Sequence, residues 1–288
     1  MIKAGFFRLF CWNIGSSLRW WWPVVVVALV AFMGWRGALE AVEMSNFSQP
    51  PVKANVWDAF FITFAGPGLW DTSLVRMLGW FVPHLLFFYF IGDLANGELL
   101  LRGYAVVPLI GSRLRWWWGK VCLLAALAAG YTILCLLVVL VVSLAQLPWS
   151  WQGGVLLNAG TLIPVSDYVG GDELLGRVFV LFSSTLFAMS CFQTTLAILS
   201  RRSFYGFMTV SMLMLLSWLL GSENPHLVRW LPGSQSMLLR HTFFDQNVSH
   251  FSFQWSFIYN AIQTLILVCM GAWYVKQMDI FGAIEDMG

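Results

Sequence analysis

The residues best suited to bind a charged partner gather in one run, residues 97–120 (GELLLRGYAVVPLIGSRLRWWWGK). Four basic side chains and one acid lie in it: Arg102, Arg113, Arg115, Lys120 and Glu98. Guanidinium and ammonium groups bind carboxylates and phosphates, so the run could contact a protein partner or anionic lipid. A basic run between two long apolar segments is predicted to lie on the cytoplasmic side. It is too short for a catalytic domain but long enough for a short helix that a cytoplasmic partner could grip.

Other patterns predict no chemistry carried by this chain. The GxxxxGK[ST] pattern of nucleotide-binding loops is absent, and the one GK pair, Gly119-Lys120, follows a tryptophan run. No HExxH or Ser/His/Asp set can be assembled with any specificity. Of the four histidines, only His241 and His250, nine residues apart in a predicted loop, have a spacing that could suit a metal, and a pair alone does not predict a site. We therefore expect no catalytic residue, no metal and no cofactor in this chain. ATP hydrolysis, if the protein uses it, belongs to another subunit.

The composition is that of a polytopic membrane protein. Hydrophobic residues make up 59% of the 288 residues and charged residues 10%, against about 25% charged residues in soluble domains. The balance of 16 basic and 14 acidic residues leaves no basic face for a nucleic acid, which we exclude as a partner. None of the five cysteines falls in a segment predicted outside, so no disulfide framework is expected.

Six segments are long and apolar enough to cross a bilayer, which takes about 20 residues of helix. Residues 1–19 mix apolar clusters with Lys3, Arg8 and Arg19, which is typical of an amphipathic helix on the membrane surface. The sequence thus predicts one all-α transmembrane domain over residues 1–288, with an interfacial helix at 1–19 and a cytoplasmic coupling loop at 97–116. The predicted spans are residues 21–39, 77–94, 117–144, 174–199, 204–221 and 257–275.

Charge predicts the orientation of these spans. With the 97–120 run inside, ten basic residues lie on the cytoplasmic side and six on the outer side, although the inner loops are the shorter ones. Both termini are therefore expected in the cytoplasm, and the protein in the cell membrane. The long outer segments 40–76, 145–173 and 222–256 contain several prolines and many aromatic residues. They are expected to be broken into short pieces that form a folded outer cap.

Ionisable residues inside the spans are nearly absent. Only His84 and Asp93, near the two ends of the second span, qualify. A proton- or ion-coupled carrier normally keeps a carboxylate or lysine near the membrane midplane, so this pattern argues against secondary transport. His84 is interpreted as a packing or interfacial residue.

The segment from Asp93 to Lys120 resembles the permease subunits of ABC-2 type exporters. Gly97-Glu98 ends the second span, Arg102 follows, and Ser112-Arg113 with Gly119-Lys120 marks the re-entry after three tryptophans. The layout of an interfacial helix, six spans and both ends inside is also similar. So is Leu231-Pro232-Gly233-Ser234, because the family often has a proline motif in the outer segment before its last span.

The resemblance implies a type V exporter-like transmembrane domain that works with a cytoplasmic ABC ATPase subunit, which binds ATP and Mg. It further implies a second permease copy, identical or related, and a substrate path between the two copies. The aromatic, largely uncharged spans would suit a peptide, an antibiotic or another amphipathic or hydrophobic cargo. The residues expected to couple to the ATPase are Gly97, Glu98, Arg102, Ser112 and Arg113. The residues expected to anchor the third span at the interface are Arg115, Trp116, Trp117, Trp118 and Lys120.

Three other interpretations of the same residues stay open. The basic side chains could serve only to fix topology and meet anionic lipid. The chain could be a non-transport membrane protein, such as an immunity or assembly factor. It could also be an intramembrane enzyme, which would need a buried catalytic pair.

Overall fold

The structure is a computed structural model that describes residues 21–48, 52–69, 73–92, 94, 111–160, 168–244 and 251–278. Within these ranges the secondary structure is helical and contains no β-strand. Six helices are long and apolar enough to cross a membrane, which confirms the all-α class and supports a multi-pass membrane protein. They are α2 (Trp22–Phe47), α4 (Leu74–Ile91), α6 (Arg113–Leu144), α8 (Gly171–Ser200), α9 (Ser203–Glu223) and α10 (Phe253–Gln277).

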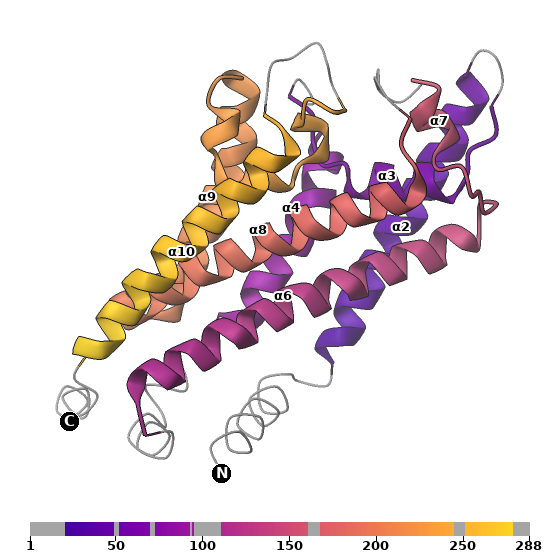
Figure 1. Ribbon diagram of the computed structural model, residues 1–288. Coiled ribbons are helices and arrows are strands. Elements are labelled where there is room, and N and C mark those ends of the chain that lie inside the picture. Colours follow the sequence, from indigo (N-terminus) through magenta and orange to yellow (C-terminus); the bar gives the residue numbers. More distant parts are fainter. Residues whose placement is uncertain are drawn as a thin grey trace.

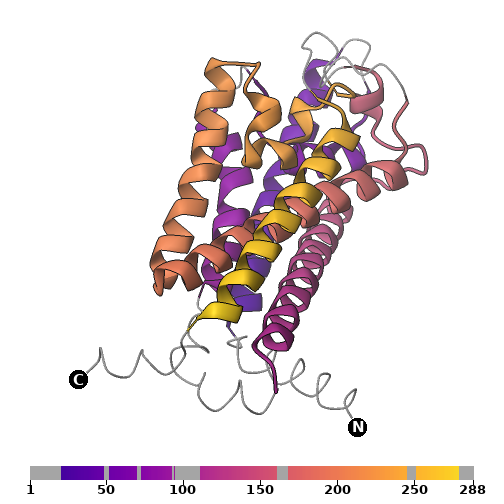
Figure 2. The ribbon, with the colours of Figure 1, turned by 60° about the vertical axis from the view of Figure 1, so that its left-hand side comes forward.

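The six helices run in alternating directions, so their termini gather at two opposite ends of the bundle (Figure 1). Two short helices, α3 (Val56–Phe64) and α7 (Val155–Asn158), lie at one end, together with three 3-10 segments between α9 and α10 (Figure 2). We call this the capped end. The opposite end, where α6 and α9 begin and α8 and α10 finish, is called the basic end. The 3-10 segments are η1 (Val228–Trp230), η2 (Pro232–Ser236) and η3 (Leu238–Arg240).

Helix α2 is longer than the sequence predicted. Pro23 stands in its first turn, where the missing N–H of proline has no cost. The expected span ended at Leu39 and the residues after it were expected to be broken into pieces, whereas the helix continues to Phe47. Residues 40–47 contain neither glycine nor proline, so nothing interrupts the hydrogen-bonded ladder before extended Ser48. The acidic side chains after residue 39 therefore project from a continuous helix.

Helix α8 is the centre of the bundle. It packs against α6, α9 and α10 and is the most buried of the six candidate spans. Gln193 Nε2 in α8 donates to the carbonyl of Phe88 in α4 at 2.8 Å, and Asn260 Nδ2 in α10 donates to Thr185 Oγ1 at 3.0 Å. Because lipid tails are as apolar as leucine, such polar pairs help to hold membrane helices together.

A buried carboxylate, Asp58, ties α3 to α7 at the capped end. Asn55 and Asp58 form a capping box, in which each side chain accepts the backbone N–H of the other. The Asp58 carboxylate also accepts the backbone N–H groups of Val155 at 3.2 Å and Leu157 at 3.1 Å. Burial raises the pKa of Asp58 above its ordinary value, although these hydrogen bonds act in the opposite sense.

The segment η2 folds back against α8, α9 and α10, and Arg240 follows it into the protein interior. Its guanidinium donates to the carbonyls of Ser217 (2.8 Å) and Trp218 (3.3 Å) in α9 and to the hydroxyl of Ser234 (2.8 Å). Burial lowers the pKa of Arg240 to about 10, so the side chain stays charged at neutral pH. The cation lies near the last turns of α9, where the helix dipole is negative.

Candidate functional site

The predicted coupling and anchor residues fall at the basic end, at the start of α6. Ser112 is the N-cap of α6, and Arg113 is its first residue. The anchor residues 115–120 occupy the first two turns, so the structure brings these two sets together on one helix. Three predicted coupling residues lie outside the described residues: Gly97, Glu98 and Arg102.

Arg113 joins the start of α6 to the end of α10. Its Nη1 donates to the carbonyl of Met278 at 2.5 Å and lies 3.4 Å from the carbonyl of Lys276. The last carbonyls of a helix lack donors within the helix and carry partial negative charge, which a guanidinium satisfies. A displacement of the chain that enters α6 at Arg113 would therefore reach α10 directly.

The three tryptophans of α6 occupy different environments. Trp116 and Trp117 are buried within the protein, whereas Trp118 is 51% exposed. The Trp117 indole N–H donates to the carbonyl of Val268 in α10 at 3.0 Å. Its ring lies against Gly271, where any Cβ would collide with it. Trp117 thus fixes α6 to α10 by packing between helices.

The other two predicted anchor residues also differ. Arg115 is exposed, while Lys120 is buried with its ammonium 5.8 Å from the centre of the Trp116 ring. Arg115 and Trp118 are therefore the predicted anchor residues that face outward on α6. Their placement at the membrane interface stays a prediction.

The two ends of the bundle differ in charge among the described residues. The basic end carries six basic side chains and no described acid: Arg113, Arg115, Lys120, Arg201, Arg202 and Lys276. All six described acids lie in or next to the helices of the capped end: Glu40, Glu43, Asp58, Asp172, Glu173 and Glu223. The capped end also carries six described basic side chains, so the two ends differ in their acids: Arg36, Lys53, Arg76, Arg177, Arg229 and Arg240. The positive-inside rule counts lysine and arginine rather than net charge, so the cytoplasmic placement of the basic end stays a prediction from the whole sequence.

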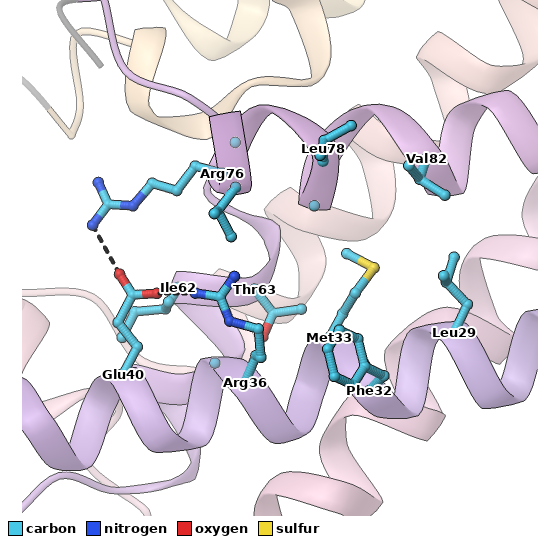
Figure 3. A pocket seen from close by; sticks show the side chains of 14 residues that line it. Leu29, Phe32, Met33, Arg36, Glu40, Ile62, Thr63, Arg76, Leu78 and Val82 are labelled. Carbon is cyan, nitrogen blue, oxygen red and sulfur yellow. Dashed lines mark hydrogen bonds and ion pairs between the residues drawn. The ribbon is translucent and has the colours of Figure 1, made fainter. Parts of the chain in front are cut away.

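A second feature, which the sequence did not reveal, is a cleft of about 250 Å³ between α2, α3 and α4 near the capped end (Figure 3). Arg76 at the start of α4 donates to Glu40 of α2 at 2.9 Å. Arg36, one turn before Glu40, lies 3.7 Å from the same carboxylate. Gly37 makes room for α3, because a Cβ there would meet Thr63.

The cleft has an apolar and a polar part. Leu29 and Met33 of α2 face Leu78 and Val82 of α4 on its apolar side (Figure 3). On the other side it continues into a wider opening of about 860 Å³ that shares its charged residues and adds Glu43. We call the whole feature the α2/α4 cleft.

The sequence indicates the charged face of α2 that lines this cleft, but not the helix that faces it. The spacing of Arg36, Glu40 and Glu43 places them on one face of a helix, but their segment was predicted to be broken after Leu39. The partner Arg76 comes from a helix that begins after α3 has intervened, and no local pattern indicates that contact.

Buried polar side chains elsewhere are engaged in packing. His84 Nδ1 lies 2.7 Å from the carbonyl of Trp80 one turn earlier in α4. His241 Nε2 lies 2.8 Å from the hydroxyl of Ser256 in α10. Over the ranges that the structure describes, no group of three or more His, Cys, Asp or Glu side chains could hold a metal ion.

No model of a known protein family matches this sequence, and no curated protein matches it.

Proposed function

We propose that this chain is the transmembrane permease subunit of an ATP-driven ABC exporter. It would work with a second permease copy and with a separate cytoplasmic ATPase subunit that binds ATP and Mg. The basic end would face the cytoplasm of a cell with both termini on that side. The cargo would be a peptide, an antibiotic or another amphipathic or hydrophobic molecule.

The observation that supports this proposal most is the attachment of α6 to α10 at the basic end. A subunit without a nucleotide-binding loop has to receive force from outside, and a short connection between two spans can act as a lever. The connection between α4 and α6 leads into Arg113, whose guanidinium donates hydrogen bonds to carbonyls at the end of α10. Trp117 holds the same two helices together one turn further on. A push on this connection would move at least α4, α6 and α10 together.

The position of η2 also agrees with the resemblance on which the proposal draws. Residues 233–236 of the proline motif segment are all buried, and the segment packs against α8, α9 and α10. A motif in an outer segment that reaches into the bundle could link a movement of the spans to the opening of a path on the outer side.

Charge reversal tests the lever. Tagged protein solubilised in detergent should bring down a subunit that carries a Walker motif and hydrolyses ATP. Glu98→Lys and Arg102→Glu should each weaken this association by about fivefold or more, because a reversed charge at a protein interface costs on the order of 1 kcal/mol or more. Arg229→Glu, an exposed site at the capped end, is the matched control. If association and ATPase activity are unchanged in both charge-reversal variants, the 97–116 loop serves only to fix the topology. If no ATPase subunit associates with the unchanged protein, the exporter proposal is wrong.

Arg113 allows a test of force transmission separate from binding. Arg113→Gln should leave the ATPase subunit bound but lower cargo-stimulated ATP hydrolysis by several-fold, because the bond to the end of α10 is weakened. Arg115→Gln is the control, since Arg115 is exposed two residues further along the same helix. Equal activity of the two variants would show that the contact between Arg113 and α10 transmits nothing.

A further inference from the structure

The α2/α4 cleft changes from apolar to charged along its length in a fixed order. Along α2 the lining side chains are Leu29 and Met33, then Arg36, then Glu40, then Glu43. At 1.5 Å per residue, Arg36 lies about 10 Å from Leu29 along the axis, and Glu43 a further ~10 Å on. Figure 3 shows Arg76 beside Glu40, and Leu78 and Val82 beside the apolar part of α2.

The first charged level of the cleft contains two guanidinium groups. Arg36 lies 3.7 Å and Arg76 2.9 Å from the carboxylate of Glu40. Each guanidinium presents five N–H donors in a planar fork. Both arginine side chains are about 40% exposed, which leaves them accessible to a ligand. A phosphate is the anion that such a fork geometry fits.

The second charged level is negative. Glu43 is exposed about two turns beyond Arg36 and lines the wider opening together with it. A molecule that follows the cleft from its apolar part therefore meets first the two guanidinium groups and then the carboxylate of Glu43. In a phospholipid with an ethanolamine headgroup, the acyl chains, the phosphate and the ammonium group follow in that order.

The cleft is also open to the lipid side. Val75 and Leu78 on α4 and Phe32 on α2 are all about half exposed, and all three line it. These apolar walls would be in hydrocarbon when the helices span a bilayer, so an acyl chain could lie along them without leaving the membrane.

From this order of side chains we propose that the α2/α4 cleft binds a zwitterionic phospholipid of the adjacent leaflet. Arg36 and Arg76 hold its phosphate, Glu43 holds its primary ammonium, and an acyl chain lies along Leu29, Met33 and Leu78. Glu40 positions the two arginines. The site does not depend on the exporter proposal, because it uses neither the coupling loop nor an ATPase.

Native mass spectrometry of the full-length protein in detergent tests this assignment. The probes are phosphatidylethanolamine, phosphatidylglycerol and phosphatidylcholine with the same acyl chains. Phosphatidylethanolamine should bind most tightly, because the glycerol headgroup lacks the ammonium and the choline headgroup cannot donate a hydrogen bond to Glu43. Arg36→Gln should weaken binding of phosphatidylethanolamine and phosphatidylglycerol alike, by about tenfold, as expected for a lost charge-assisted hydrogen bond.

The variant Glu43→Gln separates the two charged levels. Glu43→Gln should weaken the binding of phosphatidylethanolamine by about the same factor and leave the binding of phosphatidylglycerol unchanged. Glu43 is exposed and has no role in packing, so this variant remains informative if Arg36→Gln fails to fold. Arg229→Gln is the control at the same end, outside the cleft. The proposal is wrong if phosphatidylglycerol binds as tightly as phosphatidylethanolamine, if Glu43→Gln has no effect, or if Arg36→Gln leaves the binding of both lipids intact.

Discussion

Replacing Gly271 with leucine is expected to destabilise the protein by about 3 kcal/mol, the upper part of the range for overpacking a tight contact. The indole of Trp117 lies where the new side chain would have to be. The ring cannot turn away without losing its hydrogen bond to the carbonyl of Val268. Small residues at helix contacts in membranes let the helices approach closely, and this glycine does so for α6 and α10. The measurement is the midpoint of thermal unfolding in detergent.

A double-mutant cycle shows whether the contact itself is responsible. Trp117→Ala should cost about 3–5 kcal/mol, because it leaves a cavity between the two helices. The double variant of Trp117→Ala with Gly271→Leu should cost clearly less than the sum of the single effects, since the leucine fills that cavity. Gly130→Leu in α6 is the matched control, because no other group lies within 4 Å of a Cβ built there. If Gly271→Leu is as stable as this control, α6 and α10 are not held together in this way.

Removing the carboxylate of Asp58 is the second change with a large expected effect. Asp58→Ala would leave three backbone N–H groups without their acceptor: those of Asn55 and Leu157, which are buried, and that of Val155, which is partly buried. An unsatisfied buried donor costs about 1–3 kcal/mol, so the loss should be on the order of 3 kcal/mol or more. Faster amide hydrogen exchange at Val155 and Leu157 should localise the effect to the capped end. Normal protection of both amides in this variant would show that Asp58 does not hold α7.

The pH dependence gives an independent check with a defined sign. Burial raises the pKa of Asp58 in the folded protein above the ordinary value of 3.8, so the folded state holds this proton more firmly than the unfolded state does. The contribution of Asp58 to the free energy of unfolding should therefore fall as the pH rises from about 3.8 to the raised folded pKa, and stay constant above it. Asp58→Asn should remove this slope while costing less stability than Asp58→Ala, because the amide keeps one acceptor oxygen. A slope that is the same in Asp58→Asn and the unchanged protein would assign it to other groups.

The sequence by itself determined the number and type of the long elements. Each spanning helix depends on about 20 consecutive apolar residues, which is a local sum that can be read along the chain. The position of α6 is an example, since its apolar run predicted a span over residues 117–144, and the helix covers that range but begins four residues earlier, at Arg113. The grouping of the six basic residues at the basic end could also be predicted, because they cluster beside short connections. The end of α2 was harder to predict, since the helix continues past its apolar part to Phe47.

Only the tertiary structure decided which side chains meet. The tryptophan run predicted an interfacial anchor, but successive residues of a helix point about 100° apart, and α10 presents Gly271 to Trp117 while Trp118 stays exposed. The pairing of Glu40 with Arg76 likewise depends on α3 folding back between α2 and α4. Such contacts join residues that are far apart in the chain. They depend on how the helices pack, and no repeating pattern in the sequence predicts them. The spans could therefore be predicted, whereas the cleft and the attachment of α6 to α10 required the fold.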